Sequence, residues 1–439
     1  MVTVDKLSKN TYVLTNAKID TSVEVVFGDA SYSDQHGSRL GSVGDHVAWG
    51  EKDQSLFELH KLASDSPNKW PLMKTRRDFL LGLGLQVVTR AIENGKITYK
   101  VIDDAETNKI IDWLDENNYN KLLKKKAMDF IFSGRYFLKV INLLDGGVKL
   151  EHIQVFHCRP QKMEVGESKI SKYVLNGNFG TKFFRKSENV YLPAFDEENP
   201  KKFAVSILDV KDYWTGMVYN TFAEWWGTKG WTEVANDIPK FHKSGLKNGY
   251  NIKYHLSIPD DYFLKEEYPA GKNEETLKQE VLKEMADALS GVENADKTLV
   301  TYHKVLSEGR FAESGVKIVP LKNEMSDDAY TKLFNTANQV QATGHRTLPT
   351  LAGIDTGGKL GGSGKELEVS ANFMQLFLTH SDRELLLEDL MYVKKILGWG
   401  KDKFFMFENI EMYNFDTTPK DASQNQNQDL NQNTDGNAN

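Results

Sequence analysis

The strongest constraint on the fold lies in residues 344–399, where a proline- and glycine-rich loop leads into two helices. Between residues 353 and 364 this loop holds six glycines and no pattern of a buried strand. Ser363 with Glu366, and Ser381 with Glu384, fit the capping box that opens a helix. A long loop between well-defined helices is usually functional, so the segment predicts a loop that either binds phosphate or lines a surface.

The loop contains a near match to a phosphate-binding motif. Gly353 to Lys359 satisfies G-x-x-x-x-G-K, but Leu360 stands where the magnesium-binding hydroxyl residue belongs. The loop does not follow a buried apolar strand, and residues 361–365 lack the final glycine of the G-x-S-x-G nucleophile elbow. A flexible loop is the favoured interpretation. An enzyme that binds nucleotide at residues 353–359 is the alternative.

A second chemical candidate is a metal site at His152, His157 and Cys158. Cys158 is the only cysteine of the chain, so no second thiolate could complete such a site. The spacing lies on a predicted strand and favours ordinary strand packing. Paired acids such as Asp327 and Asp328 fit helix N-termini. We therefore expect no catalytic residue, no metal and no cofactor.

Composition excludes several classes of protein. The chain of 439 residues is 27% charged, carries a net charge of -7, and has no apolar run of about 18 residues that would predict a membrane helix. The N-terminus lacks an apolar signal segment, so we expect no secretion. The single cysteine excludes internal disulfides and suits a reducing cytoplasm. The acidic balance argues against a domain that binds tightly to nucleic-acid phosphates.

Hydrophobic periodicity predicts an α+β fold. Residues 66–205 form one α+β domain, with helices at 70–85, 110–117 and 119–132 and strands at 98–102, 136–143, 148–156, 170–175 and 190–192. Beyond an aromatic block come helices at 240–248, 274–289 and 326–343 and strands at 251–258, 299–305 and 316–320. Residues 1–65 are predicted to be a loosely packed arm.

Residues 212–231 form an aromatic block that contains Tyr213, Trp214, Tyr219, Phe222, Trp225, Trp226 and Trp231. Aromatic residues contribute most of the binding energy of many interfaces, and tryptophans act as buried contact residues there. We therefore predict that Trp214, Trp225 and Trp226 lie in a subunit interface. Stacking of bases or sugars on this block is a weaker alternative.

The order of these features resembles the portal proteins of tailed bacteriophages over residues 70–400. The first mark is an opening amphipathic helix, PLMKTRRDFLLGLGL, and the second is a helix, glycine and hairpin with Arg159, AMDFIFSGRYFLKVINLLDGGVKLEHIQVFHCRP. The third is a helix, Asn-Gly turn and strand, KFHKSGLKNGYNIKYHLSIP. The fourth is an H-x-x-x-P turn, glycine-rich loop and helix, from ATGHRTLPTLAGI to KELEVSANFMQLFL. The resemblance rests on the occurrence of these four marks in this order.

The resemblance implies a portal-like architecture. The expected parts are an N-terminal arm (1–65), an α/β wing (66–205), stem helices with a small β-containing clip (206–325), a channel helix, lumen loop and crown helices (326–400), and a C-terminal extension (401–439). The implied lumen loop contains Gly353, Gly357, Gly358, Lys359, Gly361, Gly362 and Gly364. It would lie on the wall of a channel.

The resemblance also implies a function without catalysis. Portal proteins form a ring, commonly a dodecamer, at one capsid vertex, through which DNA is packaged and ejected. The implied partners are copies of the chain itself, the major capsid protein, the terminase packaging motor, tail adaptor proteins, and double-stranded DNA that passes non-specifically. The implied location is the virion, after assembly in the host cytoplasm, with no membrane contact. A non-channel viral structural protein remains a further alternative.

The C-terminal residues 416–439 are rich in Asn, Gln and Asp and should be disordered. Such a segment cannot bury enough apolar surface to offset an ordering entropy of about 1–2 kcal/mol per residue. We predict that a chain truncated after Phe415 has the melting temperature of the full chain, measured by differential scanning calorimetry. A fall of many degrees would show that the tail packs against the folded protein.

Overall fold

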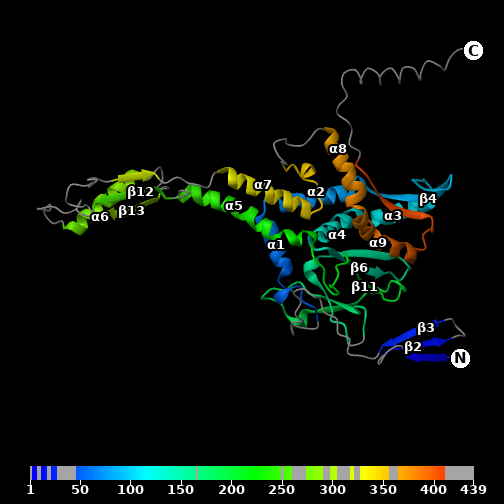
Figure 1. Cartoon of the computed structure of the whole chain (residues 1–439). Coiled ribbons are helices and arrows are strands. Elements are labelled where there is room, and N and C mark those ends of the chain that lie inside the picture. Colours follow the sequence, from blue (N-terminus) through cyan, green and yellow to red (C-terminus); the bar gives the residue numbers. More distant parts are fainter. Residues whose placement is uncertain are drawn as a thin grey trace, which may run out of the picture. The chain divides into compact units, whose positions relative to one another are not determined.

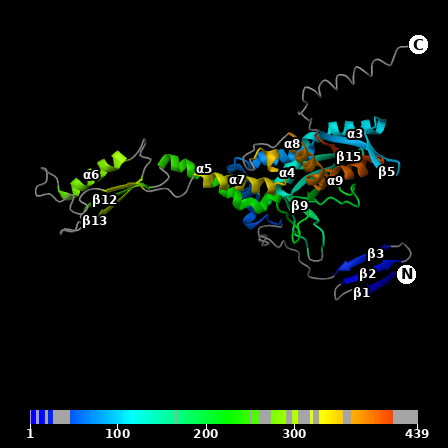
Figure 2. The same cartoon turned by 45° about the horizontal axis from the view of Figure 1, so that its top comes forward.

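The computed structural model describes residues 2–6, 11–16, 21–26, 46–164, 167–248, 252–259, 273–289, 297–303, 317–320, 327–354 and 364–410. The chain divides into two compact units. One comprises residues 1–229 and 339–439 and is called the body here; the other, residues 230–338, is called the insert. Figure 1 and Figure 2 show the elements of each unit from two sides.

Among the described residues, the body contains helices and four three-stranded sheets. Its helices are α1 (Ser55–Asp65), α2 (Lys69–Leu81), α3 (Ala105–Glu116), α4 (Tyr119–Ser133), α8 (Gly364–Phe373) and α9 (His380–Leu397). Its strands are β1 (Val2–Lys6), β2 (Thr11–Asn16), β3 (Thr21–Val26), β4 (Gly84–Glu93), β5 (Lys96–Lys100), β6 (Arg135–Asn142), β7 (Val148–Ile153), β8 (Cys158–Pro160), β9 (Lys172–Leu175), β10 (Val190–Pro193), β11 (Val205–Lys211) and β15 (Lys403–Glu408).

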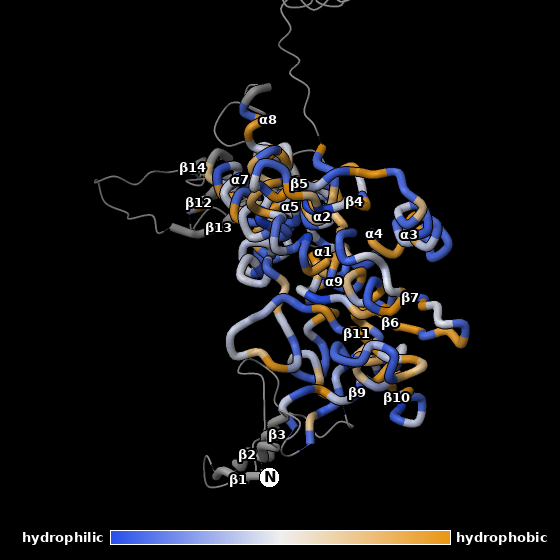
Figure 3. Tube along the Cα trace, turned by 90° about the vertical axis from the view of Figure 1, so that its right-hand side faces the viewer, coloured by the Kyte–Doolittle hydropathy of each residue, from blue (hydrophilic) through white to orange (hydrophobic). Residues whose placement is uncertain are grey.

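The central sheet of the body has the antiparallel order β11-β6-β7. In β6, consecutive residues Tyr136, Phe137 and Leu138 are all inaccessible to solvent, so this strand is covered on both faces. The helices α4 and α9 contact each other and the sheet, and they cover one of its faces. Figure 3 shows apolar residues along these strands. The predicted helix at 119–132 and hairpin at 136–156 are therefore confirmed.

A buried polar cluster joins α4 to α9. Lys126 donates to an oxygen of Asp389 at 2.6 Å and to the carbonyl of Leu386 at 2.6 Å, and Tyr119 donates to both oxygens of Asp389 at 3.0 Å. All three ionisable side chains are buried, and burial lowers the pKa of Lys126 although Asp389 opposes the shift. Such a cluster tolerates only one arrangement of the two helices, because each polar atom needs its partner.

A second sheet, of order β15-β4-β5, brings the C-terminal strand next to an early one. The β4–β5 hairpin continues past the end of β15, and Ile92 lies directly opposite Ile97 there. Both isoleucines are exposed. Lys100 of β5 forms an ion pair with Glu93 of β4. The predicted helix 70–85 ends at Leu81, and the residues after it form β4 instead.

The predicted N-terminal arm differs from the structure at its C-terminal end. Trp49, Leu56 and Leu59 belong to the main core, because α1 repeats its apolar residues at helical spacing and buries that face. Nearer the N-terminus, β1, β2 and β3 form an antiparallel sheet in the order β1-β2-β3. The expected end of the wing, residue 205, is the first residue of β11. Because β11 pairs with β6, this boundary divides one sheet.

The insert contains α5 (Lys229–Asn248), α6 (Glu274–Leu289), α7 (Asp327–Gly344), β12 (Ile252–Pro259), β13 (Lys297–His303) and β14 (Lys317–Pro320); the ends of α5 and α7 belong to the body. β12 pairs with β13 in parallel and with β14 in antiparallel, and α6 lies between the parallel strands in the sequence. Phe241 of α5 stacks on Tyr330 of α7 at 4.9 Å between ring centroids. The predicted strands and the helices at 274–289 and 326–343 are confirmed within a few residues, whereas the helix predicted at 240–248 begins earlier, at Lys229.

The mixture of helices and small sheets confirms an α+β fold. One local prediction is wrong: the Ser381–Glu384 capping box does not open α9, which begins at His380 after Thr379. A π-helical turn, Met374–Leu378, precedes Thr379 and keeps the chain helical up to that point. In the part of the chain that the structure describes, no helix is long and apolar enough to span a bilayer.

The joint between α4 and β6 depends on Gly134. Its φ of 81° is left-handed, and a Cβ built there would lie 2.4 Å from the carbonyl oxygen of Phe222. Gly146, in the β6–β7 turn, has a φ of 87° but open space around it. We predict that Gly134→Ala lowers the free energy of unfolding by about 2–4 kcal/mol, and Gly146→Ala by about 1 kcal/mol. Urea denaturation measures both, and equal losses would contradict the steric argument.

Candidate loop stems and subunit interface

The structure places the two ends of the predicted lumen loop. α7 ends at Gly344, a short 3-10 helix η5 (Pro349–Ala352) follows, and Gly353 caps it with a φ of 69°. On the other side Gly364 begins α8. Gly357, Gly358, Lys359, Gly361 and Gly362 lie outside the described residues. The structure therefore describes the two segments that flank the loop, which are called its stems here, and not the loop itself.

Four charged side chains form an ion network that holds both stems. Arg76 of α2 pairs with Glu224 and, at 2.6 Å, with Asp382. Arg346 reaches the same two acids, at 3.1 Å to Glu224 and 3.5 Å to Asp382. Arg346 precedes the loop and Asp382 follows it. The network therefore binds the turn before the loop and the start of α9 to α2.

The backbone at Arg346 shows how firmly the entry is held. Its φ is 48°, a left-handed value that L-residues seldom adopt. Such a conformation costs about 1–2 kcal/mol, and it persists where the surroundings determine it. Here the turn amides bond to the end of α7, with the Arg346 amide donating to Thr343 and the Thr347 amide to Ala342. The guanidinium is held by the two acids.

Arg76 and Asp382 of the network are buried, whereas Glu224 and Arg346 are partly exposed. Burial opposes the charge of Arg76, but Glu224 and Asp382 outweigh burial and raise the pKa of its guanidinium. Burial raises the pKa of Asp382, and repulsion from Glu224 adds to this, although Arg76 and Arg346 oppose the shift. Removing either arginine would leave a buried carboxylate without enough positive charge, which is strongly destabilising.

His345, the first residue of the H-x-x-x-P turn, is a packing residue. It is fully buried and stacks on the indole of Trp225, with ring centroids 5.6 Å apart. Gly344 beside it allows close contact, because a Cβ there would lie 2.2 Å from a methyl carbon of Thr228. The sequence mark of this turn thus reflects the tight contact between the end of α7 and the segment that carries Trp225.

Lys69 completes this buried cluster. Its ammonium nitrogen lies 3.0 Å from the Thr228 hydroxyl, 3.4 Å from Nε2 of His345 and 4.6 Å from the centroid of the Trp225 ring. No carboxylate bonds to it within the described residues. Burial therefore lowers the pKa of Lys69 to about 7.

The histidine in this cluster is neutral. Burial, together with the nearby charges of Lys69 and Arg76, lowers the pKa of His345 well below its ordinary value. Within the described residues nothing bonds to Nδ1 of His345.

The three predicted interface tryptophans lie in different surroundings. Trp225 is fully buried, and its indole donates to the carbonyl of Phe132 at 3.2 Å. Trp225 therefore belongs to the chain's own core, and its assignment to a subunit interface is wrong because no surface of it is accessible. Trp214 and Trp226 are half-buried and enclose Phe222, with ring centroids 5.7 Å and 5.1 Å away. These two remain predicted interface residues.

An open pocket of about 610 Å³ lies beside Trp214. It is lined by Asp212, Tyr213, Trp214, Thr215, Glu224, Thr343, Gly344 and Arg346. Burial raises the pKa of Asp212, and the charges of Glu224 and Asp382 raise it further. Tyr213 is 81% exposed. The pocket thus joins the ion network to an exposed aromatic surface.

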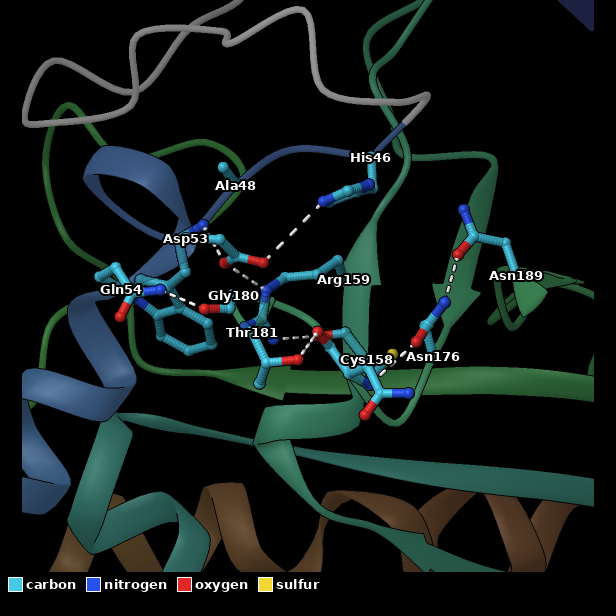
Figure 4. Close-up of polar contacts among 12 residues, drawn as sticks. His46, Ala48, Asp53, Gln54, Cys158, Arg159, Asn176, Gly180, Thr181 and Asn189 are labelled. Carbon is cyan, nitrogen blue, oxygen red and sulfur yellow. Dashed lines mark hydrogen bonds and ion pairs between the residues drawn. The ribbon is translucent and has the colours of Figure 1, made fainter. Parts of the chain in front are cut away.

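Arg159, the arginine in the second sequence mark, is also structural. It is fully buried, donates to Asp53 at 2.8 Å and to the carbonyls of Val155 and Cys158 at 2.8 Å. Its guanidinium lies over Phe179, 4.9 Å from the ring centroid. Figure 4 shows Arg159 between Asp53 and the strand that carries Cys158. Arg159 therefore binds the segment before α1 to the sheet of β8.

Two of the remaining chemical candidates, His152 and Cys158, have defined surroundings. His152 pairs with Asp129 at 2.8 Å, and Cys158 is buried, which raises the pKa of its thiol. No group of three or more His, Cys, Asp or Glu residues in the described ranges is arranged to hold a metal. Residues 327–354 contain helices and turns but no strand, so the strand-loop-helix context of a phosphate-binding motif is missing before Gly353.

Comparisons with known proteins identify solved structures with a similar fold. No protein-family model matches the chain, and no curated protein matches it. Among solved structures, a chain of the virion of a native gene transfer agent particle matches with a TM-score of 0.54 and 13% identity, covering 91% of this chain and 94% of that one.

Two neck structures match equally well. A chain of the neck of the empty gene transfer agent particle, computed with C6 symmetry, gives a TM-score of 0.54 at 14% identity and covers 92% and 96% of the two chains. The neck of the native particle, computed with C12 symmetry, gives 0.53 at 14% over 89% and 92%. The fold is that of gene transfer agent neck chains. This agrees with the resemblance to portal proteins drawn from the four sequence marks.

Sequence reasoning missed the residues that organise this region. Glu224 and Asp382 carry no local signal, since Arg76 and Asp382 are 306 residues apart. Lys69 directly precedes the predicted helix at 70–85, and its sequence position carries no signal of burial. The sequence showed His345 only as part of a turn motif. Its stacking on Trp225 explains why a histidine occupies that position.

Lys69 gives the cluster a measurable pH dependence. Its folded pKa of about 7 lies below its unfolded value near 10.4, so the unfolded chain binds more protons between these values. Stability from this group therefore rises as the pH rises through that window, by on the order of 1 kcal/mol per pH unit.

We predict that Lys69→Met is stabilised relative to the natural chain at pH 7 and that this gain shrinks towards pH 9.5. Urea denaturation of both proteins across pH 7–9.5 measures the difference. A pH-independent difference would contradict a neutral amine in the folded state.

Proposed function

We propose that the chain is a portal protein that assembles into a ring, commonly of twelve copies, at one vertex of a virus-like particle. The observation that carries the proposal is the shared fold with neck and virion chains over about nine-tenths of both chains. The four ordered sequence marks support it independently, and two of them coincide with buried structural residues, Arg159 and His345.

The ring would surround the path of double-stranded DNA. Residues 353–364 would lie at the channel, held at both ends by the ion network. The net charge of -7 suits such a conduit, because a wall that neutralised many phosphates would bind DNA tightly instead of letting it pass. Lys359 and Lys365 would make brief phosphate contacts. No catalysis is needed for this role.

Ring closure requires two different surfaces on each copy that fit each other. Trp214 and Trp226, with the exposed Tyr213, are proposed as one of them. The expected partners beyond the ring are the major capsid protein, the terminase packaging motor and the tail adaptor proteins. The location would be the virion, following assembly in the host cytoplasm.

Negative-stain electron microscopy of the purified chain tests the proposal directly. Rings with a central hole are the expected result at micromolar concentration and near-physiological salt. A monomeric mass in the presence of capsid protein as well as alone would contradict it. The double variant Trp214→Ala and Trp226→Ala should lose rings while its circular dichroism spectrum shows that the chain remains folded.

The loop can be separated from assembly. We predict that deletion of Gly357 to Gly362 leaves rings intact, because loop-closure entropy changes by at most about 1 kcal/mol and the stems stay fixed. The deletion should reduce DNA packaging or retention, since the constriction widens. Microscopy and a nuclease-protection assay of packaged DNA measure the two effects, and normal packaging would place the loop elsewhere than in the channel.

A further inference from the structure

An apolar ridge runs along the outside of α8 and the π-helical turn that continues it. The ridge consists of Val369, Phe373, Leu376 and Phe377, which are 60%, 45%, 56% and 66% exposed. The rings of Phe373 and Phe377 contact each other at 5.3 Å between centroids. Ala371 and Met374, on the opposite side of the same helix, are fully buried in the body. The helix is therefore apolar on both sides, and such helices are normally buried all round.

Gln375 lies between these two sides and binds the chain that leaves β15. Its amide nitrogen donates to the carbonyl of Ile410 at 3.1 Å, and its amide oxygen accepts from the Ile410 amide at 2.6 Å. Gln375 is 1% exposed, so this pair of bonds is shielded from water. In Figure 1, α8 and the end of β15 lie on the same side of the body. The chain beyond Ile410 thus starts directly beside Leu376.

The residues that follow Ile410 have the composition needed to cover the ridge. The sequence continues Glu411, Met412, Tyr413, Asn414, Phe415, and then becomes polar. Of residues 416–439, Leu430 is the single large apolar residue. Three large apolar side chains therefore follow immediately after the point where the chain is bound.

We propose that residues 411–415 of the same chain bind along this ridge and cover Phe373, Leu376 and Phe377. Five residues reach at most about 17 Å, whereas a helix with its side chains is about 10–12 Å wide. The segment can therefore cross from Gln375 to Phe377. Its attachment at Ile410 gives an effective concentration on the order of millimolar, which favours this segment over a separate molecule.

The proposal does not depend on ring assembly. It makes the C-terminal part of the chain a cover for the helix that follows the predicted lumen loop. It also divides residues 411–439 into a binding part, 411–415, and a dispensable part, 416–439.

Engineered disulfides test the contact, because Cys158 is buried and its raised thiol pKa keeps it unreactive. The double variant Phe377→Cys with Tyr413→Cys, oxidised mildly, should form mostly an intrachain disulfide, seen by peptide mapping and a mobility shift on a non-reducing gel. The control combines Tyr413→Cys with Leu144→Cys, in the fully exposed turn between β6 and β7. It should form little disulfide.

Each other outcome overturns the proposal. Covalent dimers or larger species would show that a second copy covers the ridge, and equal disulfide in the control would show random collision. Absence of a disulfide in both variants would show that the segment does not reach the ridge. Oxidation at a concentration where the chain is monomeric, measured by mass photometry, keeps this result separate from the test of the ring.

Truncation gives a second readout that needs no cysteine. A chain ending at Ile410 should bind several-fold more of an apolar fluorescent dye than the full chain, because the ridge becomes exposed. A chain ending at Phe415 should bind as little dye as the full chain. Equal dye binding by both truncated chains, with unchanged circular dichroism, would overturn the proposal.

Discussion

The ion network of Arg76, Glu224, Arg346 and Asp382 is the interaction on which this region of the body depends. It joins α2, the segment that carries Trp225, the turn after α7 and the start of α9. Buried charges are costly to desolvate and are tolerated only with good geometry on all sides. The four side chains therefore specify one relative placement of these elements. The segments before and after residues 353–364 are therefore held in that placement. The left-handed backbone of Arg346 is held with them.

Local signals predicted most of the secondary structure. They did not predict which distant elements pair or pack together. The helical stripe of α4, Gly134 and the Asp-Gly-Gly turn gave the helix and hairpin of the central sheet, because each signal acts within a few residues. The pairing of β15 with β4 has no such signal, since register between distant strands depends on the whole core. The capping box at Ser381 failed because the π-helical turn extends the helix to Thr379.

The candidate site was predictable in part. The glycine-rich loop and its flanking helices followed from composition, whereas the network that holds them connects residues far apart in the sequence. Trp225 was assigned to an interface because density of aromatic residues does not distinguish core from surface. The marks of the family resemblance proved to be packing residues, such as His345 against Trp225. Packing of this kind explains how a fold can persist at 13–14% identity over about nine-tenths of the chain.

The hairpin of β4 and β5 has a consequence for association between copies of the chain. β5 is an edge strand, and the exposed Ile92 and Ile97 beside it would favour pairing with the edge of another molecule. Lys96 and Lys100 stand at the two ends of β5, and charged residues on an edge strand oppose such pairing because a second strand would have to desolvate them. Lys96 and Lys100 therefore disfavour edge-to-edge pairing between copies and leave other surfaces for ordered association.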